Sequence, residues 1–263
     1  MSFLAAAGWT LVAVMVFAIA IVIAEGLRAG AMNDVVTRAT CGALAYSVTL
    51  FIILRIHEPE SSIRKVLALK MPPILTIPLA IIAGAGLYGP SEWLENLLLA
   101  RFPYSDQEKE MLDKLQTVAS YDAAPKRIAV AVIMVLIVPF LDELFFRGAL
   151  FTPLRKRARL ESVVMATAAY EALSSTPHVR FIIPMLLLSL ALAWIRGLTG
   201  STITSALARM AFFAPAIIPH AIGKEMPALS KGMIAGSLGA AVLSLAMMAM
   251  IARGRVLDEA EES

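Results

Sequence analysis

Five ionisable side chains fall inside long apolar stretches of this 263-residue sequence: Asp142, Glu143, Arg147, Glu171 and Arg209. An ionised group is costly in the hydrocarbon interior of a membrane, so such residues commonly mark a functional site. Carboxylates in a partly wet cavity can act as general bases toward water, and cationic groups can stabilise developing negative charge. The alternative interpretation is a structural ion-pair cluster that joins helices. Glu143 and Arg147 are four residues apart, which lets them pair on one helical face.

The stretches that must position these residues have the length of membrane spans. Hydrophobic residues make up 59% of the chain and charged residues 16%, and about 20 consecutive apolar residues cross the hydrocarbon core of a bilayer. The sequence therefore predicts an all-α, polytopic membrane protein of about eight transmembrane helices, in contact with the lipid bilayer. This composition excludes a soluble domain and gives no support to nucleic-acid binding. The predicted helices are residues 3–24, 37–56, 72–89, 127–152, 160–175, 180–196, 200–219 and 232–252.

The loops predict the domain organisation and the orientation in the membrane. Residues 90–126 are polar with scattered apolar positions, which predicts an extramembrane or interfacial amphipathic loop. The remainder of 1–252 is expected to form a single transmembrane domain, followed by a tail at 253–263. Because cytoplasmic loops are rich in lysine and arginine, the basic loops place both termini in the cytoplasm of a multi-pass inner (cytoplasmic) membrane protein. These basic residues are Arg55, Arg64, Lys65, Lys70, Arg155, Lys156, Arg157 and Arg159.

The acidic pair belongs to a recognisable motif. Residues 141–151 have the sequence Leu-Asp-Glu-Leu-Phe-Phe-Arg-Gly-Ala-Leu-Phe and are followed by a basic segment at 154–157. This motif resembles the first motif of the CPBP family, the CAAX protease and bacteriocin-processing-like intramembrane endopeptidases, which has the form Glu-Glu-x-x-x-Arg-Gly. Residues 199–201, Thr-Gly-Ser, resemble the start of the family's last motif helix. The resemblance covers about residues 127–215 and implies the membrane fold of that family.

The resemblance also implies a set of catalytic positions. In the family, the first glutamate and a histidine of a Phe-x-x-x-His motif activate the water that attacks the peptide bond, and a His-x-x-x-Asn motif stabilises the oxyanion. In this sequence the first glutamate position holds Asp142, whereas Glu143 and Arg147 are retained. Asp142 and Glu143 are therefore the candidate catalytic carboxylates, and their activity depends on the remaining motif positions.

Those remaining positions hold residues that cannot perform the family's chemistry. The two histidine positions fall on Ser174 and Arg209, and the asparagine position falls on Phe213. A serine does not take up a proton near neutral pH, an arginine stays charged, and a phenylalanine donates no hydrogen bond.

The three histidines present do not restore the motifs. His57, His178 and His220 are expected in loops or at span ends, and a rearranged site that uses His178 is the one alternative among them. Because histidine and cysteine do not cluster in the sequence, no metal and no cofactor are predicted.

The substitutions together predict a change of function. Arg209 can pair with Asp142, Glu143 or Glu171, which would convert a wet catalytic site into a neutralised cluster. We therefore predict a proteolytically inactive family member, a pseudoprotease that acts as a scaffold or accessory subunit and binds another membrane protein or a peptide. Two alternatives stay open: an active intramembrane endopeptidase that uses Asp142 or Glu143, and a transporter-like membrane protein.

Overall fold

A computed structural model describes residues 1–105, 109, 124–175, 179–224 and 229–261. The described residues form helices and connecting turns, without a strand. The all-α fold is therefore confirmed. The α-helices are α1 (Phe3–Leu27), α2 (Val35–His57), α3 (Ile63–Val66), α4 (Thr76–Arg101), α6 (Ala124–Val132), α7 (Val138–Glu143), α8 (Phe151–Arg155), α9 (Leu160–Ser175), α10 (Val179–Thr199), α11 (Thr202–Ala221) and α12 (Lys231–Glu261). A 3₁₀ turn, η1 (Ala31–Asn33), joins α1 to α2.

Six stretches among the described residues are long and apolar enough to span a membrane: Phe3–Leu27, Val35–His57, Ala124–Arg155, Arg180–Thr199, Thr202–Ala221 and Lys231–Gly254. The chain is thus a multi-pass integral membrane protein. The other two predicted spans are also helical. Helix α9 has 16 residues and is only about 24 Å long. Helix α4 has 26 residues, but its second half carries Glu92, Glu95 and Arg101.

Helix α4 ends later than the sequence predicted. It continues through Pro90 to Arg101, so residues 90–101 of the predicted loop are helical. Residues 106–108 and 110–123 of that loop lie outside the described residues.

The motif residues lie on a long helix that is interrupted twice. The stretch from α6 to α8 spans 32 residues and contains two π-helical segments, η2 (Ile133–Ile137) and η3 (Leu144–Leu150), on either side of α7. A π-helical turn changes the direction in which the following side chains point, and such turns are frequent at functional sites. Within this stretch, Glu143 ends α7 and Arg147 lies in η3.

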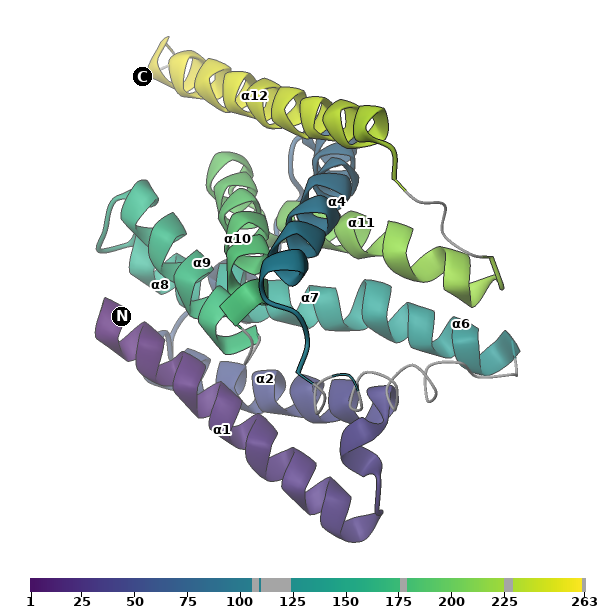
Figure 1. Cartoon of the computed structure of the whole chain (residues 1–263). Coiled ribbons are helices and arrows are strands. Elements are labelled where there is room, and N and C mark those ends of the chain that lie inside the picture. The colour runs from purple at the N-terminus through teal and green to yellow at the C-terminus, as the bar shows by residue number, and fades with distance from the viewer. Residues whose placement is uncertain (106–108, 110–123, 176–178, 225–228, 262–263) are drawn as a thin grey trace.

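The other helices surround this long helix. Helix α7 packs against α2 on one side and against α11 on the other, while α4 packs against both α11 and α12 (Figure 1). Gly84 makes the contact between α4 and α11 possible, because a Cβ atom there would overlap the carbonyl oxygen of Ala208. Small residues allow such close approach of membrane helices. The tight contact fixes α11 against α4 at Ala208, the residue that precedes Arg209.

Candidate functional site: a buried charge cluster

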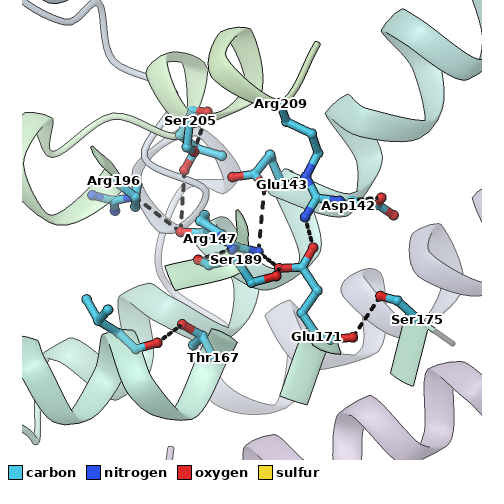
Figure 2. A network of polar contacts seen from close by, with 12 residues as sticks. Asp142, Glu143, Arg147, Thr167, Glu171, Ser175, Ser189, Arg196, Ser205 and Arg209 are labelled. Atoms are coloured by element: carbon cyan, nitrogen blue, oxygen red, sulfur yellow. Dashed lines mark hydrogen bonds and ion pairs between the residues drawn. The ribbon is translucent and has the colours of Figure 1, made fainter. Parts of the chain in front are cut away.

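The side chain of Arg209 lies among three carboxylates. Its Nε donates to Oε1 of Glu143 at 2.8 Å, and its Nη1 donates to Oδ2 of Asp142 at 2.7 Å. Its Nη2 pairs with Oε1 of Glu171. The Arg209 side chain is 2% exposed, and Glu143 and Glu171 are fully buried. One guanidinium group therefore binds acids from α7 and α9, as Figure 2 shows.

Arg147 completes the cluster from the opposite side. Its Nη1 pairs with Oε2 of Glu171 and lies 3.6 Å from Oε1 of Glu143, and all three side chains are fully buried. Its Nη2 donates to the carbonyl oxygen of Ser189 at 2.6 Å, while Oγ of Ser189 donates to Glu171 at 2.5 Å. Glu171 is thus held by both arginines and by one hydroxyl (Figure 2). We call the five ionisable residues, Asp142, Glu143, Arg147, Glu171 and Arg209, the charge cluster.

The charge cluster is almost neutral. Three carboxylates face two guanidinium groups, so the formal charge is minus one when every group is ionised. Asp142 is the most exposed of the carboxylates, with 16% of its side chain exposed. The surplus negative charge can be solvated only there, since an ion in a dry interior is strongly disfavoured.

Asp142 and Arg209 lie at the wall of a cavity of about 310 Å³. The cavity is bounded by α1, α2, α7, α9, α10 and α11, and its walls are mainly apolar. The lining residues are Thr10, Ala13, Val14, Phe17, Arg38, Ala39, Gly42, Ala43, Ala45, Tyr46, Val138, Leu141, Asp142, Ser174, Ser175, Met185 and Arg209. The charge cluster therefore meets a space that can hold part of another molecule.

The structure brings together most of the residues that the motif analysis selected. Ser174 lines the cavity, but its Oγ donates to the carbonyl oxygen of Glu171 at 3.1 Å. Phe213 lies one turn beyond Arg209 on α11, where it packs against Phe212 with ring centroids 5.2 Å apart. Phe213 therefore belongs to an apolar core and does not line the cavity.

The histidines lie elsewhere. His57 ends α2 and its Nε2 accepts a hydrogen bond of 2.8 Å from Nε1 of Trp9. His220 is exposed in the last turn of α11, and His178 lies outside the described residues. In the part of the chain that the structure describes, no group of three or more histidine, cysteine, aspartate or glutamate residues could hold a metal ion.

Two further residues of the site were missed by sequence reasoning. Ser189 binds both Arg147 and Glu171, and Nε of Arg196 donates to the carbonyl oxygen of Arg147 at 3.2 Å. Ser189 and Arg196 are seven residues apart on α10, so two helical turns place them on the same face. This spacing, together with the burial of a cation inside a predicted span, was the signal that could have revealed them.

The fold and the site define a class: a helical membrane protein with an acidic pair and an arginine on one long helix, facing an intramembrane cavity. Residues 124–222, from the start of α6 to the end of α11, match the family described as type II CAAX prenyl endopeptidase Rce1-like. This match confirms, over these residues, the resemblance inferred from the motif. Comparisons with curated proteins and with solved structures found no match.

Proposed function

We propose that this protein is a proteolytically inactive member of the Rce1-like CAAX protease family that binds another membrane protein or a peptide, as a scaffold or accessory subunit. The observation that carries the proposal is the position of Arg209 among Asp142, Glu143 and Glu171. A family protease requires a carboxylate that is free to accept a proton from water. Arg209 instead occupies an oxygen atom of each of the three carboxylates.

The neighbouring groups do not supply the missing chemistry. A guanidinium group stays protonated, so Arg209 cannot accept a proton as the family's histidine does. Ser174 can donate or accept a hydrogen bond but is a poor base, and its Oγ already donates to a backbone carbonyl. Asp142 is the carboxylate that water in the cavity would reach. Its Oδ2 already accepts from Nη1 of Arg209 at 2.7 Å, which lowers its ability to take a proton from water.

Binding without cleavage uses features that the site retains. The apolar walls of the 310 Å³ cavity suit a hydrophobic side chain of a partner, and Asp142 and Arg209 offer polar contacts at one wall. Ligand sites commonly combine apolar walls with a few placed polar groups.

The proposal includes the orientation in the membrane. The N-terminal amino group lies close to the basic loops: burial, and then the positive charge of Arg157, lowers the pKa of the Met1 amino group. Helix α12 ends toward the side on which α1 begins (Figure 1). This arrangement supports the assignment of both termini and the basic loops to the cytoplasmic side of the inner membrane.

The first experiment tests for a partner. The intact protein is purified in mild detergent beside Arg209→Ala and the control Arg101→Ala, which removes an exposed arginine at the end of α4. Mass spectrometry should find a stoichiometric membrane partner with the wild type and with the control, and less of it with Arg209→Ala. Purification of the wild type without any stoichiometric partner contradicts the scaffold role.

The second experiment tests the alternative of an active protease. The wild type is incubated with a prenylated CAAX peptide in detergent, and we expect no cleavage. Cleavage that is abolished by Glu143→Gln, in a variant that elutes and melts like the wild type, would establish an endopeptidase and refute the proposed inactivity.

A further inference from the structure

A second cavity lies among basic residues at the ends of α8 and α10. It consists of two adjoining parts of about 340 and 550 Å³, which share Thr152, Arg196 and Gly200 as lining residues. We call this space the basic cavity. Six cations line it, and no acidic side chain does: Arg64, Lys65, Lys70, Arg155, Lys156 and Arg196.

Arg196 gives the strongest indication that the basic cavity has a ligand. The residue is 7% exposed, and its contacts are neutral: the carbonyl oxygen of Arg147, the hydroxyl of Thr152 at 3.2 Å and the ring of Phe151 at 5.1 Å. Among the described residues no carboxylate forms an ion pair with it. A buried charge without a counter-ion is costly, so an anion from outside the chain would offset that cost.

The other cations leave the cavity short of negative charge. Lys156 pairs with Glu58 at 2.6 Å. Within the described part of the chain, the remaining five cations of the basic cavity have no acidic partner. Lysine and arginine side chains bind phosphate oxygens strongly, and arginine does so with several donors at once.

The backbone around the basic cavity is held in place. Oγ of Ser201 donates to the carbonyl oxygen of Lys70 at 2.6 Å, and the backbone amide of Thr202 donates to the carbonyl oxygen of Ala68 at 3.2 Å. Gly200 adopts a φ of +66°, and a Cβ atom there would lie 3.0 Å from Nζ of Lys70. The absence of a side chain at Gly200 therefore keeps space open beside the lysine.

We propose that the basic cavity binds the anionic phosphate group of a lipid headgroup or of a free phosphate compound. Basic pockets between helices at the membrane surface bind acidic headgroups in this way. The cavity lies at the ends of α8 and α10, beside the predicted cytoplasmic loops, where a headgroup would be present.

The test measures binding of three probes to the full chain in detergent by isothermal titration at fixed ionic strength. The probes are dihexanoyl phosphatidic acid, dihexanoyl phosphatidylcholine and inorganic phosphate. We expect saturable binding of phosphatidic acid and much weaker binding of phosphatidylcholine. Competition by inorganic phosphate would indicate a free phosphate compound as the ligand, and absence of competition would indicate a lipid headgroup.

Paired variants assign the binding to the basic cavity. Lys65→Gln/Lys70→Gln removes two exposed cations from its rim, and Arg55→Gln/Arg253→Gln removes two exposed cations that do not line it. The first variant should bind phosphatidic acid about thirtyfold more weakly, since each cation near an anionic headgroup contributes about a fivefold effect. The second should bind within about twofold of the wild type. Equal losses in the two variants, equal binding of the two lipids, or no binding of either phosphatidic acid or inorganic phosphate would overturn the proposal.

Discussion

The charge cluster contains the buried arginine Arg209, and the basic cavity contains the buried arginine Arg196. The two arginines have opposite surroundings. In the charge cluster, Arg209 is engaged by three carboxylates of the chain itself. In the basic cavity, the polar contacts of Arg196 are a backbone carbonyl and a hydroxyl. The same residue type is thus neutralised from within the protein in one region and lacks a carboxylate in the other.

Arg147 joins the two regions. Its side chain pairs with Glu171 in the charge cluster, whereas its carbonyl oxygen accepts from Nε of Arg196 at 3.2 Å and from the hydroxyl of Thr202 at 3.4 Å. Counter-ions, more than burial, therefore decide what a buried cation can do. A guanidinium group with internal partners stabilises the fold, and one without them can recognise an anion from outside.

The largest loss of stability is expected when a cation is removed from the charge cluster. Arg147→Met would leave Glu171 and Glu143 buried with less compensating charge, which should lower the free energy of unfolding by about 3–5 kcal/mol. Equilibrium unfolding in mixed detergent micelles measures this loss. The control Arg101→Met removes an exposed arginine and should change stability by less than about 0.5 kcal/mol. Equal stability of the two variants would show that the charge cluster does not hold the helices together.

The sequence alone predicted much of the charge cluster. Charged residues within apolar spans are rare, so all five members stood out, and the spacing of Glu143 and Arg147 predicted their pairing. The three pairs of Arg209 with acids were also inferred as possible partners, and each is observed.

The parts that could not be predicted depend on how helices pack. The π-helical segments around α7 have no marker in an apolar sequence, and a serine such as Ser189 is unremarkable in a membrane helix. Phe213 was assigned by motif spacing, but the cavity does not extend one turn beyond Arg209 along α11. The basic cavity was hidden because five of its six cations had been explained by membrane orientation alone, and the sixth, Arg196, lies at the end of a predicted span.

A smaller loss of stability is expected from a substitution in the backbone of the basic cavity. Gly200→Ala places a side chain at a φ of +66°, a left-handed conformation that costs about 1–2 kcal/mol for a residue other than glycine. The new methyl group would also contact Nζ of Lys70, so binding of phosphatidic acid should weaken together with stability. Thermal unfolding and titration of the same preparation measure both quantities.

The matched control for that substitution lies in α12. Nothing lies within 4 Å of a Cβ atom at Gly236, so Gly236→Ala should raise stability by about 0.5–1 kcal/mol, because alanine favours a helix over glycine. If Gly200→Ala behaved like Gly236→Ala, the backbone at Gly200 would not shape the basic cavity.

The smallest loss of stability is expected when Lys156, the cation of the basic cavity that pairs with Glu58, loses this partner. A hydrogen bond from Lys156 is the main reason that the pKa of Glu58 lies below its ordinary value of 4.5. The stability that this pair contributes is therefore fully present above about pH 4.5 and is lost as the pH falls through the lowered pKa. Because the Lys156 side chain is 55% exposed, Glu58→Gln should lower stability at neutral pH by no more than about 1 kcal/mol.

The same substitution also changes the number of cations without an acidic partner in the basic cavity. Without the Glu58 carboxylate, Lys156 becomes a sixth cation of the basic cavity without an acidic partner among the described residues. Binding of phosphatidic acid should then tighten about fivefold, as expected for one additional free cation near an anionic headgroup. In the control Glu161→Gln, which removes an exposed acid in the first turn of α9, affinity should stay unchanged. An unchanged affinity in Glu58→Gln as well would mean that the supply of internal counter-ions does not govern anion binding in this cavity.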